Sequence, residues 1–213
     1  MIPLEFRPDL IVEATNACDR VCPGCYAPNI VVEAGAAASA PGAIHLSPES
    51  LDQAWPDNVV GTVSIRGGEP TLNPLLAALL RRISERAAAV YLETNGSWIS
   101  PGSPLLSVLS ESGCVVKLSL DNMHGTSADE ARTKLAVLAE AGVKTAVAIT
   151  ESTLEQFERT SARLLHGFNG QVFWQKKASS PAELIRPAIG VISAKGKLEG
   201  SVSNLLKGSP SLE

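Results

Sequence analysis

Short apolar runs alternate with longer segments of helical periodicity along this chain. The runs rich in Val, Ile and Leu predict strands at Leu10–Ala14, Val63–Arg66, Val90–Glu93, Val115–Leu120, Thr145–Ile149 and Val172–Trp174. The segments between them predict helices at Pro48–Trp55, Leu75–Ala88, Pro104–Ser112, Ala128–Ala141 and Leu154–Leu165. Strands that alternate with helices in this way are typical of parallel β-α units, so the pattern predicts an α/β fold. Six units are too few to close an eight-stranded barrel.

The alternation weakens in two places. Residues Val31–Ala43 are rich in Ala and Gly and predict a loop insertion before the first helix. After Ala178 one apolar run, Leu184–Ile192, precedes a tail rich in Gly, Ser and Lys, which we expect to be flexible from Ser193 onward. We therefore predict a core domain over residues 1–178 and a partly flexible C-terminal extension over residues 179–213.

Composition narrows the class of protein. A length of 213 residues with 45% hydrophobic residues suits a single soluble globular domain. The formal net charge of −4 argues against a nucleic-acid partner, which needs a basic surface. No apolar stretch approaches the roughly 20 residues of a membrane span, and Met1–Arg7 is too short and polar for a signal peptide. We expect a cytoplasmic protein with no membrane partner.

A group of cysteines directly follows the first predicted strand. Cys18, Cys22 and Cys25 have the spacing C-x3-C-x2-C. Three thiolates on one short loop can hold three irons of a four-iron, four-sulfur cluster and leave the fourth iron open to a ligand. Structural zinc usually takes four ligands from two separated Cys/His pairs, whereas the fourth cysteine, Cys114, is distant in sequence and the loop contains no His. Disulfides cannot pair three cysteines.

Glycine-containing motifs follow the next two strands. Gly67-Gly68-Glu69-Pro70 offers a backbone that can approach a ligand closely and a carboxylate beside it. Thr94-Asn95-Gly96 offers polar side chains after the third strand. The carboxyl ends of parallel strands gather at one end of such a fold, so both motifs should lie near the cysteine loop. Each is also compatible with a plain turn or helix cap.

The fourth strand ends in polar residues. Strand alternation places Ser119 and Asp121 on one face, where both can bind a ligand. Alternatively, Asp121 caps the turn that contains His124. Lys176 and Lys177 follow the sixth strand and either bind an anionic group or are solvated. Cys114 begins the fourth strand, so we expect it to be buried at the opposite end.

Together these motifs resemble the radical S-adenosylmethionine (SAM) superfamily, over roughly Asp9–Ala178. The resemblance implies an open, partial (β/α)6 TIM-like barrel with a 4Fe-4S cluster and SAM as cofactors. It implies that Cys18, Cys22 and Cys25 are the metal ligands and catalytic residues. The SAM-binding residues that it implies are Tyr26, Gly67, Gly68, Glu69, Thr94, Asn95, Ser119 and Asp121.

The resemblance also implies an activity. The reduced cluster cleaves SAM to methionine and a 5'-deoxyadenosyl radical, which abstracts a hydrogen atom from a small-molecule, nucleoside or peptide substrate. The electron comes from a one-electron reductant such as flavodoxin or ferredoxin. Only one further cysteine remains, so a second cluster with its own cysteine ligands cannot be built. The sequence does not identify the substrate.

Two alternatives stay open at this point. Activases of glycyl-radical enzymes can be this short, but their D-x-K motif is absent, because Asn122 and Met123 follow Asp121. A non-enzymatic domain could use the cysteine loop for zinc or for a protein partner. That second alternative gives no role to Glu69 or to the glycines before it.

Overall fold

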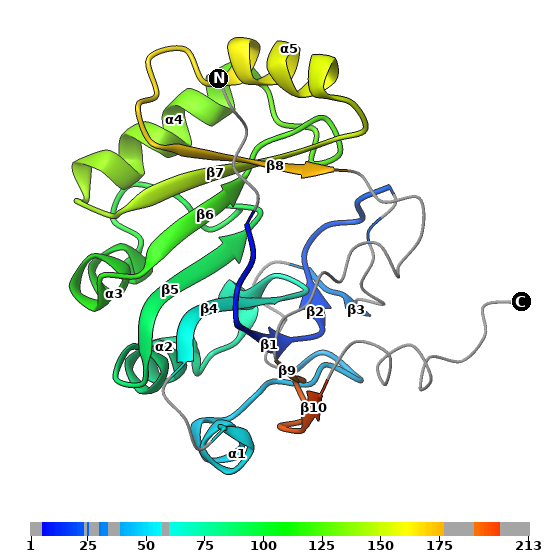
Figure 1. Ribbon diagram of the computed structural model, residues 1–213, viewed down its shortest axis with the longest axis vertical. Coiled ribbons are helices and arrows are strands. Elements are labelled where there is room, and N and C mark those ends of the chain that lie inside the picture. Colours follow the sequence, from blue (N-terminus) through cyan, green and yellow to red (C-terminus); the bar gives the residue numbers. More distant parts are fainter. Residues whose placement is uncertain are drawn as a thin grey trace, which may run out of the picture.

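A single curved sheet forms the centre of the molecule (Figure 1). The computed structural model describes residues 6–23, 25, 30–33, 39–56, 60–176 and 190–200. Within these ranges the sheet has the order β10-β9-β1-β4-β5-β6-β7-β8. Its strands are β1 (Leu10–Thr15), β4 (Val60–Gly67), β5 (Ala87–Thr94), β6 (Val115–Ser119), β7 (Thr145–Glu151), β8 (Gln171–Lys176), β9 (Gly190–Ile192) and β10 (Leu198–Gly200).

The sheet is parallel and open. Each neighbouring pair from β9 to β8 runs parallel, and only β10 is antiparallel to its neighbour. The edge strands β10 and β8 are not paired with each other in the strand order. The expected α/β fold with the architecture of a partial TIM-like barrel is therefore confirmed.

Helices cover one face of this sheet (Figure 1). They are α1 (Pro48–Ala54), α2 (Leu76–Ser84), α3 (Pro104–Ser112), α4 (Ala128–Glu140) and α5 (Leu154–Leu164). Several begin where a polar side chain caps the first turn: Ser47 accepts from the backbone N–H of Ser50, and Thr153 forms a reciprocal capping box with Gln156. Side chains that alternate along the strands, such as Ile65, Leu92 and Leu118, are fully buried in the core cluster that the helices cover.

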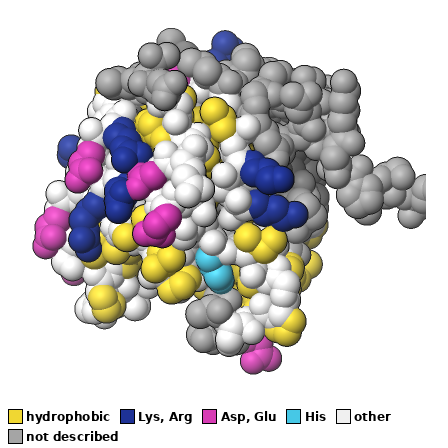
Figure 2. Space-filling view, turned by 90° about the horizontal axis from the view of Figure 1, so that it is seen from below, with side chains coloured by type: hydrophobic (Ala, Val, Ile, Leu, Met, Phe, Trp, Pro, Cys, Tyr) yellow, Lys and Arg dark blue, Asp and Glu magenta, His cyan; other side chains and the backbone are white. Residues whose placement is uncertain are grey.

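The helical surface carries charges of both signs. Seen from below, basic and acidic side chains are intermixed (Figure 2). One such group joins α1 to α2, because Asp52 pairs with Arg82 and, at 2.8 Å, with Arg86. None of the helices in the described ranges has the length and apolar character that crossing a membrane requires.

Two predicted boundaries are wrong. Ala87 and Ala88 were expected to end a helix, but α2 stops at Ser84 and both residues belong to β5, where Ala87 pairs with Val60 of β4. Alanine has the highest intrinsic helix propensity, but propensity is easily overridden by tertiary context, so pairing with the neighbouring strand decides the conformation here. Val31, expected in a loop, pairs with Cys18 in the two-stranded sheet of β2 (Ala17–Cys18) and β3 (Ile30–Val31).

The C-terminal extension contributes to the main sheet. Strand β9 lies parallel to β1, and Ser193–Gly200 turns back to form β10, whereas flexibility was expected from Ser193 onward. The apolar side chains of Val191 and Ile192 are buried, which stabilises this arrangement. Apart from Gly190–Ile192, the apolar run Leu184–Ile192 lies outside the described residues, and the domain division at residue 178 stays a prediction.

Candidate functional site

The cysteine loop begins beyond the carboxyl end of β1. Cys18 lies in β2, where its carbonyl accepts from the Val32 N–H at 2.9 Å. The chain then turns so that the Cys25 N–H donates to the Cys22 carbonyl at 3.1 Å. Cys18 is buried, Cys22 is half-buried and Cys25 is exposed, and all are free thiols. Gly24 and the predicted SAM-binding residue Tyr26 lie outside the described residues.

The environments of Cys18 and Cys22 disfavour the negative charge of their thiolates. Burial raises the pKa of Cys18 to about 11, and the charges of Glu69, Asp19 and Cys22 add to this effect. Burial and then the neighbouring Cys25 raise the pKa of Cys22. These mutual effects mean that the thiolates repel one another across the loop, so a bound cationic centre would relieve the repulsion. Among the described residues, no group of three His, Cys, Asp or Glu side chains is arranged to hold a single metal ion.

The glycine pair packs against the chain that leads into this loop. A Cβ atom on Gly67 would lie 2.2 Å from the Thr15 carbonyl oxygen, and one on Gly68 would lie 2.0 Å from that of Ala17. Hydrogen bonds join the same segments: Gly68 N–H donates to Thr15 at 2.8 Å, and Glu69 N–H donates to Ala17 at 2.7 Å. The close approach that these glycines permit is therefore to protein backbone.

Glu69 connects the two glycine-containing motifs. Its side chain is buried, and Oε1 accepts from the backbone and hydroxyl of Thr71 and, at 2.7 Å, from the hydroxyl of Thr94. Oε2 accepts from the Asn95 N–H at 2.8 Å. Burial raises the pKa of Glu69 despite these hydrogen bonds. The carboxylate is thus fixed in place, and Oε2 retains capacity for a further donor.

Thr94 and Asn95 extend this network in two directions. The Thr94 hydroxyl accepts from the Gly96 N–H and from the Trp98 indole, both at 3.0 Å. The Asn95 side-chain amide donates to Asp19 at 2.8 Å, which reaches into the cysteine loop. The predicted residues of three loops are therefore brought together at one end of the sheet.

Arg20 connects the cysteine loop to the end of β6. Its guanidinium donates to the His124 carbonyl at 2.7 Å and lies 3.6 Å from Glu130 of α4. Neither Arg20 nor Asp19 was singled out from the sequence. Their signal was only their position between the first two cysteines, which does not reveal these distant partners.

The two polar residues that end β6 differ in their surroundings. Asp121 is fully buried and accepts from the His124 N–H and ring at 2.9 and 2.7 Å and from the Thr150 N–H at 3.1 Å. These contacts correspond to the turn-capping role that the sequence left open. Burial raises the pKa of Asp121, but the hydrogen bonds from His124 and Thr150 outweigh it, so the pKa lies below its usual value. Ser119 is half-buried on the strand itself.

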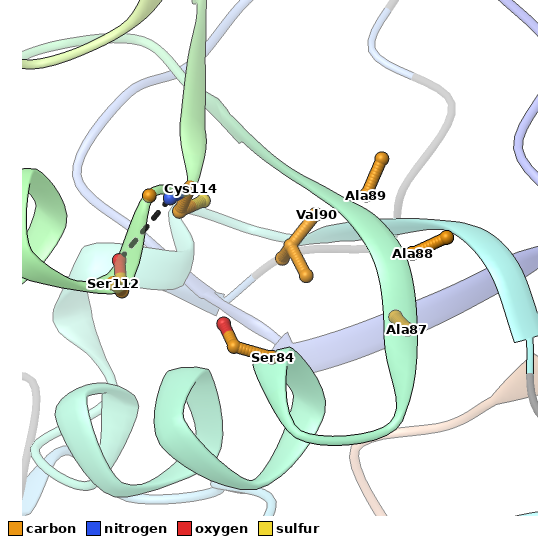
Figure 3. Close-up of a pocket in the computed structure, with 8 residues that line it drawn as sticks. Ser84, Ala87, Ala88, Ala89, Val90, Ser112 and Cys114 are labelled. Carbon is orange, nitrogen blue, oxygen red and sulfur yellow. Dashed lines mark hydrogen bonds between the residues drawn. The ribbon is translucent and has the colours of Figure 1, made fainter.

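Cys114 lies away from this site, as expected. It borders a shallow pocket at the amino ends of β5 and β6, with Ser84, Val90 and Ser112 (Figure 3). Its backbone N–H donates to the Ser112 hydroxyl at 3.3 Å. Burial raises the pKa of its thiol to about 12, so it stays protonated. The side chain of Lys176 and all of Lys177 lie outside the described residues.

Two solved structures of SuiB from Streptococcus suis resemble this chain. The complex with the precursor peptide SuiA has a TM-score of 0.60 and 18% identity and covers 96% of this chain and 45% of that chain. The complex with S-adenosylmethionine has a TM-score of 0.59 and 19% identity and covers 96% of this chain and 46% of that chain. The chain thus spans less than half the length of SuiB. No family profile and no curated protein matches it. The likeness shows that this chain and part of SuiB share a fold.

Proposed function

We propose that this protein is a radical SAM enzyme that holds a 4Fe-4S cluster on Cys18, Cys22 and Cys25. The observation that carries the proposal is the meeting of three loops at one end of a partial barrel, because Asn95 bridges Glu69 to Asp19 of the cysteine loop. A domain that used the cysteines only for zinc would have no need of this buried connection.

The thiols fit such a cluster chemically. The pKa values of Cys18 and Cys22 are raised by burial and by a neighbouring cysteine, so their thiolates need a cationic centre to become stable, and an iron–sulfur cluster supplies one. When bound and reduced, the cluster supplies one electron to the SAM sulfonium, which splits into methionine and a 5'-deoxyadenosyl radical. A one-electron reductant such as flavodoxin or ferredoxin supplies that electron.

The remaining motif residues hold and orient SAM in this proposal. Glu69 Oε2, with one internal donor, accepts a hydrogen bond from the SAM ammonium, whose charge offsets the burial of the carboxylate. Gly67, Gly68, Thr94, Asn95 and Ser119 line the same end of the sheet. Asp121 acts by holding the turn that anchors Arg20. Tyr26, which lies outside the described residues, also binds SAM in this proposal.

The substrate is a small molecule, nucleoside or peptide that offers a C–H bond to the radical. With SAM bound, transfer of that hydrogen atom to the 5' carbon would give 5'-deoxyadenosine and a substrate radical. SuiB, the neighbour in fold, was solved with a precursor peptide, but this chain spans 45% of that protein.

The test is an anaerobic SAM-cleavage assay. The protein is reconstituted with iron and sulfide, reduced with dithionite and mixed with SAM, and 5'-deoxyadenosine is measured by chromatography. We expect product from the wild type and from Cys114→Ala, whose cysteine lies at the opposite end of the sheet, but not from Cys22→Ala. Absence of product from a wild-type protein that holds zinc in place of iron would overturn the proposal.

A further inference from the structure

A row of alternating charges crosses the face of the sheet opposite the helices. Glu13 of β1 is paired in register with Arg66 of β4, and Glu93 of β5 is paired with Lys117 of β6. Ser64 pairs with Tyr91, so Arg66, two residues later, lies level with Glu93. Adjacent strands are about 4.8 Å apart, which gives a neutral row of acid, base, acid and base.

Lys117 is the most deeply buried member of this row. Its side chain is 1% exposed and its Nζ lies 3.2 Å from Glu93 Oε2, without the alignment of a hydrogen bond. An ammonium has three donors, so its hydrogen-bonding capacity is largely unused. A buried polar group without hydrogen bonds costs about 1–3 kcal/mol or more. Within the described part of the chain, the ion pair with Glu93 and the nearby aromatic rings are the contacts that offset this cost.

Glu93 is held ionised beside it. Burial raises the pKa of Glu93, but the charges of Lys117 and Arg66 and the hydrogen bond from the Ser64 hydroxyl outweigh it, and the pKa is lowered. Burial lowers the pKa of Lys117, and Glu93 offsets part of this effect. A second anion next to Lys117 would favour its charged form further.

The row lies close to the residues that we assign to SAM. Glu93 immediately precedes Thr94, and Lys117 lies two residues before Ser119 on the same strand face. The row is therefore one layer below the residues that we assign to SAM. This inference rests on the proposed function, since only SAM bound above the row makes this face the substrate side.

An aromatic ring covers Lys117. Its Nζ lies 4.0 Å from the ring centroid of Phe6, which also packs at 4.8 Å against Tyr91 and at 5.2 Å against Phe173. Phe6 is half-buried and precedes β1, so its displacement breaks none of the sheet hydrogen bonds found among the described residues. Its face supplies only a weak cation–π contact in place of a hydrogen-bond acceptor.

We propose that Lys117, Glu93 and Arg66 form the substrate-recognition site and that the site takes a carboxylate-bearing substrate, whose anionic group replaces the Phe6 ring against Lys117. A monoanion suits the row better than a phosphate dianion, because Glu93 lies beside the position that it enters. Gln175, which donates to Glu93 at 3.5 Å, borders the site on β8.

The test compares carboxylates with their uncharged amides. The reconstituted full chain with SAM, without a reductant, is titrated with N-acetylalanine and with acetyl-trialanine, each against its primary amide, in ligand-observed NMR. Comparing the two acids distinguishes a site for a small-molecule carboxylate from a site for the carboxyl terminus of a peptide. We expect at least one acid to bind about tenfold or more tightly than its amide, the effect of a charge-assisted hydrogen bond.

Variants identify the responsible group. Lys117→Met should remove the preference for the acid, whereas Lys144→Met, which removes an exposed lysine near the amino end of β7, should keep it. Lys117→Met leaves Glu93 unpaired and can unfold, so Glu93→Gln/Lys117→Met, which removes both charges, is measured as well after a circular-dichroism check. Equal binding of acid and amide, no binding of either, or a preference that survives in the folded double variant would overturn the inference. Because no reductant is present, these results are independent of SAM cleavage.

Discussion

At the scale of single residues, the motif residues form hydrogen bonds and packing contacts with one another in the absence of any ligand. Glu69 receives hydrogen bonds from Thr71, Thr94 and Asn95, and the glycines before it pack against Thr15 and Ala17. The Gly67–Pro70 motif, which resembles a ligand-binding motif, therefore also holds three loops together. Its pre-organisation means that little order has to be gained when a ligand binds.

Asp121 gives a test of this internal role through pH. Its pKa lies below the ordinary value of about 3.9, so its hydrogen bonds stabilise the fold above that pH and are lost as pH falls through the folded-state pKa. Asp121→Asn should cost about 1–3 kcal/mol at pH 7, because an amide cannot accept from both His124 and Thr150. Urea unfolding should show the difference shrinking below about pH 3.

The control for this prediction is Asp129→Asn. Asp129 is 89% exposed on α4, where its pairing with Arg132 is screened by solvent, and its loss should cost less than about 0.5 kcal/mol. Equal losses for Asp121→Asn at pH 7 and pH 3 would show that the cost comes from packing alone.

Sequence patterns predicted the residues of the local motifs but not the row of charged residues, and the difference has a physical reason. The cysteines, Glu69 and Thr94 lie in short local motifs after strands, and the prediction that they meet needed only the rule for parallel sheets. The row of Arg66, Glu93 and Lys117 is visible as polar residues at alternate strand positions. The sequence could not predict that these charges lie side by side, because their pairing depends on strand register, which hydrophobic periodicity does not supply.

Close packing of two elements explains Gly68, whereas Gly67 also has a φ of +147°, which favours glycine. Gly68→Ala would place a Cβ 2.0 Å from the Ala17 carbonyl oxygen and force the end of β4 away from the cysteine loop. We expect a loss of about 2 kcal/mol or more in urea unfolding, together with weaker iron incorporation. Gly102→Ala is the matched control, since nothing lies within 4 Å of its Cβ and only its φ of +79° opposes alanine, at about 1 kcal/mol. Equal effects would remove the packing explanation.

Substitution of Arg20 can test how the cysteine loop is held to the rest of the protein. Arg20→Met removes the donor to the His124 carbonyl and the contact with Glu130, so the loop should lose its anchor while the core stays intact. We expect about tenfold weaker cluster retention, measured as iron per chain after desalting, with less than about 1 kcal/mol lost from the free energy of unfolding.

The control for Arg20 is Arg132→Met. Arg132 pairs with Asp129 on the exposed side of α4 and is 57% exposed, so it should not affect iron content. Unchanged iron retention in Arg20→Met would mean that the loop is held by Asp19 and the β2–β3 pair without it.

At the scale of elements, local signals predicted starts better than ends. Ser47 and Thr153 begin helices where expected, because a capping side chain is a local feature. The end of α2 was misplaced, since Ala87 and Ala88 have no local preference strong enough to resist pairing with β4. Boundaries that tertiary pairing decides cannot be read from periodicity.

At the scale of the whole molecule, the sheet has two different faces. The outer face carries the apolar core under the helices, and the opposite face carries charge and aromatic rings. The six central strands were predicted because each has a strong apolar run. Strands β9 and β10 were missed because each contains only three residues, β10 lies in Gly/Ser/Lys-rich sequence, and β9 finds its place only by pairing with β1.

We therefore expect the hairpin of β9 and β10 to stabilise the sheet, and two truncated chains can test this. Both lack residues 201–213; one ends after Gly200 and the other after residue 189. The shorter chain leaves β1 as an unpaired edge and exposes Ile11, which packs with Val191. Burial of Val191 and Ile192 contributes about 1.5–3 kcal/mol for each side chain, so the shorter chain should be less stable by about 3 kcal/mol or more in urea unfolding and should aggregate.

Val191→Asp in the full-length chain should reproduce this loss without truncation, since it buries an unpaired charge beside β1. If both truncated chains unfold at the same urea concentration, β1 is stable as an edge strand and residues 190–200 serve another purpose than the stability of the sheet.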